Sequence, residues 1–175
     1  MPELNIQSFN HLKIHTQYSI CEGAIKIDNL KSFCKEKKIP CLGLSDTSNL
    51  CGALEFAENI SKVGTQPIIG TQIFFRFEDT TGLLPLIALN EKGYKRIIEL
   101  SSRSYLENDA LSDPHLDIKE LLIDIEGVSL LSGTIHGLFG KLFQKGRLEE
   151  ISKIYKSLSS KFHDNFYLEI QRHGD

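Results

Sequence analysis

Residues 9–19 (FNHLKIHTQYS), 39–50 (IPCLGLSDTSNL) and 66–75 (QPIIGTQIFF) share one pattern, an apolar strand-like run that ends in polar residues. Apolar strands that alternate with helical patterns predict a parallel sheet covered by helices, and so an α/β fold. In such folds ligands gather at the carboxyl ends of the strands. We therefore expect the polar ends of these three segments to face a common pocket.

The remainder of the chain continues the alternation of strands and helices. Hydrophobic periodicity and turn residues predict strands at 9–15, 40–44, 67–77 (interrupted at Gly70), 83–89, 128–132 and 166–170, and helices at 27–37, 49–62, 91–103, 118–123, 137–144 and 147–162. Residues 105–115 have the composition of a loop. A closed barrel and an open doubly wound sheet share this pattern, so periodicity alone leaves both open.

Composition narrows the class of protein. A length of 175 residues suits one domain or part of a larger one, and 20 basic against 23 acidic residues give no overall basic field for nucleic acid. The N-terminus lacks the pattern of a signal peptide, and the apolar run at 83–89 is too short to span a bilayer. The four cysteines lack zinc-site spacing, which favours free thiols. We expect a cytoplasmic protein without a membrane partner.

The polar strand ends lack most ligands of a hydrolytic metal site. Such a site needs neutral imidazoles and carboxylates that converge on one point. Lys13, Thr47 and Gln72 stand where two histidines and a carboxylate would be needed. Period-two alternation places His11, Lys13 and His15 on one face of the first strand. An inert polar cluster is favoured over a working metal site, and we expect the Lys13 ammonium to pair with Asp46.

Six motifs, taken in order, resemble a known family. They are HLKIHTQYS, PCLGLSDTSNLCGALEFAE, QPIIGTQIFF, ALNEKGYKRIIELSSRSYL, LLSGTIHGLFGKLF and FYLEIQRHG, and they run from about Phe9 to Gly174. Together they resemble the N-terminal PHP domain of the bacterial replicative DNA polymerase III alpha subunit. The resemblance implies an incomplete PHP-type distorted βα barrel, of which residues 1–175 form the N-terminal part. The polymerase domains would lie further along a longer chain.

The resemblance also implies a degenerate site. The HxH of metal-binding members corresponds to Lys13-Ile14-His15, and their TDH to Ser45-Asp46-Thr47. The positions of the degenerate site are Lys13, His15, Asp46, Thr47, Gln72 (for a glutamate), Leu83 (for a histidine) and Thr134 (for the cysteine of an LSGC motif). Only His15 and Asp46 keep the residue types of metal ligands, so we expect neither a catalytic residue nor a bound metal here.

The resemblance implies a function within a larger assembly, the polymerase III holoenzyme. The full-length protein would be a DNA-directed DNA polymerase, a nucleotidyltransferase of DNA replication with magnesium at its polymerase site. Its partners would be DNA, the proofreading exonuclease subunit and other subunits of the polymerase III holoenzyme. The present part would be a non-catalytic structural module that docks the exonuclease. The alternatives are a metal-dependent phosphoesterase or 3′–5′ exonuclease with altered ligands, and an α/β protein outside this family.

Overall fold

The computed structural model describes residues 9–109 and 111–171, and it confirms the α/β class. Five α-helices and two 3-10 helices accompany six strands in this part of the chain. The helices are α1 (Ile27–Lys37), α2 (Ala53–Ser61), α3 (Glu91–Leu106), η1 (Ile118–Leu122), α4 (Leu138–Gln144), α5 (Leu148–Phe162) and η2 (His163–Asn165). The strands are β1 (Cys41–Thr47), β2 (Gln66–Phe77), β3 (Thr80–Ala88), β4 (Leu116–Asp117), β5 (Val128–Leu131) and β6 (Phe166–Tyr167).

The sheet is mixed, with strand order β1-β2-β3-β5-β6 and with β4 paired to β2. The pairs β1–β2, β2–β4 and β5–β6 are parallel, whereas β2–β3 and β3–β5 are antiparallel. The expectation of uniformly parallel strands is therefore wrong for the centre of the sheet. Only Glu78 and Asp79 separate β2 from β3, and a connection of that length can form a hairpin but no parallel crossover.

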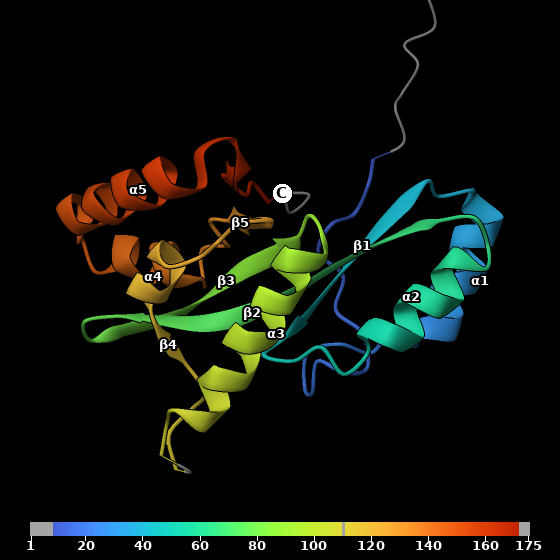
Figure 1. Ribbon diagram of the computed structural model, residues 1–175, viewed down its shortest axis with the longest axis horizontal. Helices are drawn as coiled ribbons and strands as arrows, with labels where there is room; N and C mark the ends of the chain where they lie inside the picture. Colours follow the sequence, from blue (N-terminus) through green and yellow to red (C-terminus); the bar gives the residue numbers. More distant parts are fainter. Residues whose placement is uncertain (1–8, 110, 172–175) are drawn as a thin grey trace, which may run out of the picture.

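Two apolar cores hold the helices on the sheet. The smaller core joins α1 and α2 to β1, and the larger joins β2, β3 and β5 to α3, α4 and α5. Figure 1 shows the consequence: α1 and α2 lie beside β1, and α4 and α5 lie toward the other end of the sheet. Within the described ranges no helix is long and apolar enough to cross a membrane.

Helix α2 and strand β2 differ from the prediction, each for its own reason. Helix α2 begins at Ala53 and not at Asn49, since the Asn49 side chain bonds the carbonyls of Tyr18 and Thr47 and the amide of Cys51. The predicted interruption of β2 at Gly70 is wrong, because β2 pairs with both neighbours at that residue. A side chain at Gly70 would place its Cβ 2.5 Å from the carbonyl oxygen of Leu86, which accounts for the glycine.

The first segment, residues 9–16, is paired to β1 but is not the regular strand that was predicted. Gly43 donates its N–H to the His11 carbonyl at 2.7 Å and accepts the Ile14 N–H at 3.1 Å. In a regular parallel ladder, the two residues that bond the N–H and the C=O of one residue on the neighbouring strand lie two positions apart in sequence. His11 and Ile14, which bond Gly43, lie three positions apart, so one extra residue forms a bulge. Alternation is not kept across a bulge. His11 accordingly lies exposed, while Lys13 and His15 are half-buried.

The bulge fits against β1 because residue 43 is a glycine. A Cβ at this position would lie 2.4–2.6 Å from backbone atoms of Leu12. We predict that Gly43→Ala lowers the free energy of unfolding by about 1–3 kcal/mol through overpacking. Urea denaturation measures the loss, and amide exchange should accelerate at Ile14 but not at Ile73 in β2. Unchanged stability with unchanged exchange at Ile14 would contradict this account of the bulge.

Candidate functional site

The candidate site is built around Asp46, a fully buried carboxylate near the carboxyl end of β1. Its oxygens accept hydrogen bonds from the Thr16 N–H at 2.6 Å, the Thr16 hydroxyl at 2.7 Å and the Ser19 hydroxyl at 2.6 Å. Buried carboxylates are tolerated when their lone pairs are satisfied in this way. Asp46 therefore ties the first segment and the turn that follows it to the end of β1.

His15 extends the network to β2. Its Nε2 lies 3.0 Å from Nε2 of the Gln72 amide, and its Nδ1 lies 3.2 Å from the Ser19 hydroxyl. The Gln72 amide nitrogen is a donor, so Nε2 accepts and Nδ1 carries the proton that it donates to Ser19. Ser19 in turn donates to Asp46 and accepts the Thr47 N–H at 3.1 Å. This assigns a neutral imidazole with both ring nitrogens engaged.

The electrostatics of the site support the neutral form. Burial lowers the pKa of His15 below its ordinary value of 6.5, and the nearby Lys13 ammonium acts in the same direction. Glu22 opposes them, with a carboxylate oxygen 3.6 Å from Nδ1. The same Glu22 oxygen accepts a hydrogen bond from the Thr47 hydroxyl at 2.5 Å. Here we call Thr16, Ser19, Glu22, His15, Asp46, Thr47 and Gln72 the polar cluster.

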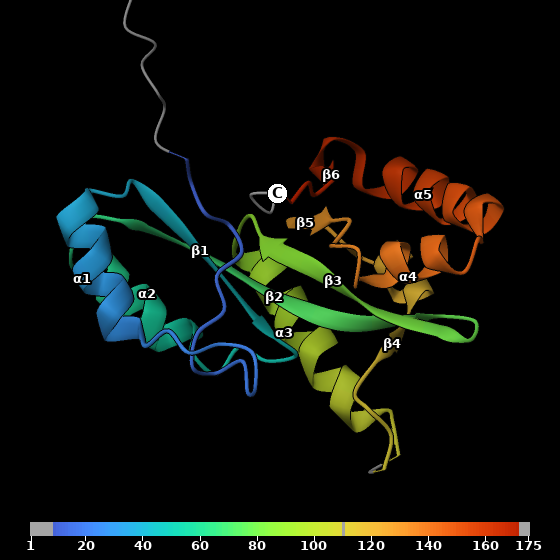
Figure 2. The same cartoon turned by 180° about the vertical axis from the view of Figure 1, so that it is seen from behind.

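Lys13 does not pair with Asp46, so that prediction is wrong. Its ammonium lies 3.0 Å from Oε1 of Glu169, in the segment after β6. The hydroxyl and amide donors already satisfy the oxygens of Asp46, so the buried carboxylate needs no ammonium as a hydrogen-bond partner. Glu169 is positioned by its own N–H, which donates to the Ser132 hydroxyl at 2.9 Å. In Figure 2 the described residues after β6 run toward the first segment, and the ion pair connects the two segments.

Leu83 and Thr134 lie close to one another but make no hydrogen bond to the polar cluster within the described residues. Leu83 is half-buried on β3, opposite Phe74. Its carbonyl lies against Gly133 and Gly137, the loop that carries Thr134, where added Cβ atoms would approach to 3.0 and 2.8 Å. The Thr134 hydroxyl accepts the N–H of His136. Leu83 therefore brings only an aliphatic side chain to this region, and the Thr134 hydroxyl bonds the backbone of the turn in which it lies.

Sequence reasoning missed four residues of the site. They are Thr16, Ser19, Glu22 and Glu169. Thr16 and Ser19 belong to the polar end of the first segment, and two hydroxyls three residues apart after a histidine were the available signal. No sequence signal pointed to Glu169, because its contact with Lys13 joins segments that lie 156 residues apart in the chain.

The donor set does not fit a hydrolytic metal centre. Zinc normally takes three or four protein ligands of imidazole, thiolate or carboxylate type. Within residues 9–109 and 111–171 no group of three such side chains is placed to hold an ion. The free ligand positions of His15 and Asp46 are occupied by Ser19, Gln72 and Thr16. Lys13 adds a positive charge, which opposes a second cation.

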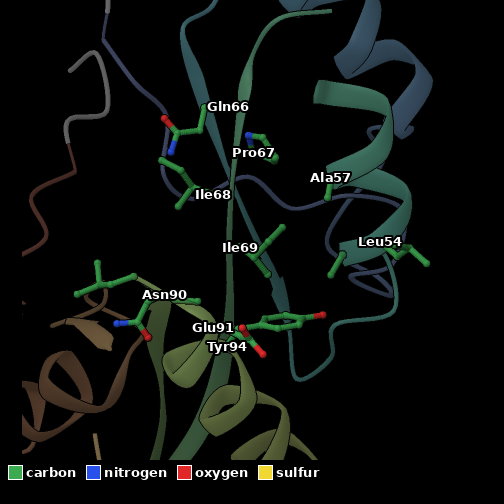
Figure 3. A pocket seen from close by; sticks show the side chains of 12 residues that line it. Leu54, Ala57, Gln66, Pro67, Ile68, Ile69, Asn90, Glu91 and Tyr94 are labelled. Atoms are coloured by element: carbon green, nitrogen blue, oxygen red, sulfur yellow. The ribbon is translucent and has the colours of Figure 1, made fainter. Parts of the chain in front are cut away.

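A separate groove lies between α2 and α3, over the start of β2, with a volume of about 430 Å³. Figure 3 shows Leu54 and Ala57 of α2, Ile68 and Ile69 of β2, and Tyr94 of α3 along it. The β2–β3 hairpin supplies no crossover helix to fill this space. The carboxylate in its lining belongs to Glu91, which pairs with Lys95 at 2.6 Å. No residue of the polar cluster is part of the lining.

Comparison with known proteins identifies the family of the chain. The PHP domain family matches residues 11–173, which is nearly the whole chain. The chain belongs to the PHP domain family. Among individual relatives, DNA polymerase III subunit alpha of Caulobacter vibrioides is 38% identical over 99% of this chain, and that of Borreliella burgdorferi is 36% identical over 95%.

The relatives are much longer than this PHP domain. The chain spans 16% of the Caulobacter protein and 15% of the Borreliella protein, and it is homologous to the N-terminal region of DNA polymerase III alpha. Among solved structures, an amidohydrolase from Chromobacterium violaceum is 12% identical, with a TM-score of 0.45 over 84% of this chain and 54% of that one. A likeness this distant adds nothing to the functional argument.

The Lys13–Glu169 pair gives a first prediction about the PHP site. Its side chains are 18% and 13% exposed, and Oε2 of Glu169 is buried without a hydrogen-bond partner among the residues that the structure describes. Lys13→Met should lower the free energy of unfolding by about 1–3 kcal/mol, because the carboxylate is left without its cation. Adding Glu169→Gln should restore part of the loss. Urea denaturation of both single variants and the double variant measures the coupling.

An exposed pair supplies the matched control. Lys92 and Glu126 are 52% and 71% exposed, so Lys92→Met should lower stability much less than Lys13→Met does. Equal losses in Lys13→Met and Lys92→Met, or no recovery in the double variant, would show that the Lys13–Glu169 pair does not hold the two segments.

His15 gives a prediction about pH. Its folded pKa is lowered, so the unfolded chain takes up a proton at higher pH than the folded chain does. Its contribution to stability is complete above the unfolded value of 6.5 and declines as the pH falls below it. Between about pH 7.5 and about pH 5.5 we expect a steeper loss in the native chain than in His15→Gln. Parallel curves of unfolding free energy against pH would refute the assignment of a neutral His15.

Proposed function

We propose that this chain is the PHP domain of a DNA polymerase III alpha subunit and that it is a non-catalytic module of that enzyme. The observation that carries the proposal is the occupation of the metal-ligand positions by Lys13, Thr47 and Gln72. Hydrogen bonds satisfy the retained His15 and Asp46, and an ion pair with Glu169 satisfies the neighbouring Lys13. The domain then contributes structure and a docking surface, without chemistry of its own.

The full-length protein is, on this proposal, a cytoplasmic DNA-directed DNA polymerase of the replication machinery. Its relatives carry the name of the alpha subunit, and the chain covers a small part of their length. Catalytic magnesium and the contacts to template DNA belong to the remaining part. The partner proposed for the PHP domain is the proofreading exonuclease subunit of the same holoenzyme.

A second candidate is a metal-dependent phosphoesterase or 3′–5′ exonuclease with an altered ligand set. The observation in its favour is that Glu22 and Glu169 lie near His15, so that two carboxylates accompany the retained ligand types. Against it, Glu169 is paired with Lys13 and Glu22 with the Thr47 hydroxyl. A metal would have to break these contacts before it could bind.

Two measurements on the same purified chain test the proposal. The chain should bind the exonuclease subunit of its own organism in calorimetry, with or without chelator and equally well in His15→Ala. It should hydrolyse bis(p-nitrophenyl) phosphate no faster than buffer when Mn²⁺ or Zn²⁺ is supplied. The His15→Ala variant serves as control for both, since it removes a retained ligand type from the polar cluster.

The outcomes separate the candidates. Metal-dependent hydrolysis that disappears in His15→Ala would establish the phosphoesterase and exclude the non-catalytic role. Absence of exonuclease binding at micromolar concentrations would exclude the docking role.

A further inference from the structure

A second groove, lined chiefly by apolar side chains, lies between η1 and α5 and ends at the last residue of β2. We call it the η1–α5 groove. It is lined by Phe77, Ile118, Lys119, Leu122, Lys153, Ile154, Ser157 and Leu158. Its volume is about 250 Å³, below the roughly 300 Å³ at which small-molecule pockets begin. This size suits one or two side chains of another polypeptide better than a cofactor.

The floor of the η1–α5 groove is apolar. Ile118, Ile154 and Leu158 are buried there and belong to the larger core, which fixes their positions. Ser157 is the uncharged polar residue in the lining, and its hydroxyl donates to the Lys153 carbonyl of its own helix at 3.1 Å. The Ser157 proton is therefore engaged within its own helix, and the apolar floor favours an aliphatic or aromatic side chain.

The rim of the groove is positively charged. Lys119 and Lys153 are exposed on opposite walls, one on η1 and one on α5, and neither ammonium pairs with a carboxylate in the part of the chain that the structure describes. Of the nearby carboxylates, Glu120 bonds Arg103 at 2.7 Å and Glu150 bonds Arg147. Two exposed ammonium groups without an ion-pair partner among the described residues, beside an apolar floor, complement an apolar side chain flanked by acidic ones.

We propose that the η1–α5 groove docks a short acidic segment of a partner protein, with one leucine, isoleucine or phenylalanine inserted between Lys119 and Lys153. The buried apolar side chain supplies most of the affinity, and the two ammonium groups supply selectivity for acidic flanks. A nucleic acid would use the lysines but gains nothing from the apolar floor. An uncharged apolar segment would use the floor but leave the lysines unpaired.

This surface is distinct from the polar cluster. Phe77 follows Gln72 by five residues along β2, which corresponds to about 17 Å. Figure 1 shows α5 at the end of the sheet away from α1 and α2. The inference goes beyond the proposed function, because it names a surface and the chemistry of its partner without assuming that the partner is the exonuclease subunit.

The test selects a random octapeptide phage library on the full chain. Ser157→Phe, whose added ring fills the groove from the exposed face of α5, serves for counter-selection. We expect enrichment of peptides with one large apolar residue beside at least two acidic residues. The enriched peptide should bind the native chain in fluorescence anisotropy and weaken as salt is raised. Lys119→Glu and Lys153→Glu should each weaken binding about fivefold or more.

Lys156→Glu provides the matched control, because it makes the same charge change on α5 outside the groove lining. It should alter the affinity by less than about twofold. Thermal denaturation of every variant establishes that the fold is retained. Enrichment of basic or uncharged peptides, no enrichment against Ser157→Phe, equal effects of Lys153→Glu and Lys156→Glu, or displacement of the peptide by oligothymidylate would each overturn the proposal.

Discussion

The buried carboxylate of Asp46 is the constraint on which the site depends. Removing a carboxylate from water costs several kcal/mol unless donors replace its hydration. Thr16 and Ser19 supply these donors, so the first segment and its following turn are held at the end of β1. Ser19 then orients His15, and His15 contacts Gln72 on β2. One desolvated group thereby fixes the relative position of three parts of the chain.

The same constraint underlies the proposal that the PHP site supports structure and not metal chemistry. The hydrogen bonds that satisfy Asp46 and His15 occupy the lone pairs that a metal would need, and Lys13 introduces a fixed positive charge nearby. The ammonium does not neutralise Asp46. It instead joins the first segment to the segment after β6 through Glu169, which brings distant ends of the sheet together.

Features governed by local pattern were predictable from the sequence, and features governed by single polar side chains were not. The bounds of α1 match the prediction, because Ile27, Leu30 and Cys34 form a regular buried stripe. The late start of α2 was not predictable because it depends on the hydrogen bonds of the Asn49 side chain to three backbone groups, one of them in the distant turn at Tyr18. The bulge beside Gly43 and the partner of Lys13 escaped for a similar reason, since both depend on contacts between segments that sequence spacing does not specify.

If intramolecular contacts take the place of a metal in this PHP domain, a calorimetric titration of the chain with Zn²⁺ and Mn²⁺ after chelator treatment should show no stoichiometric binding. The native chain and the double variant His15→Ala/Asp46→Asn should then give the same baseline. A tight site that holds about one ion per chain and is lost in that variant would contradict this account.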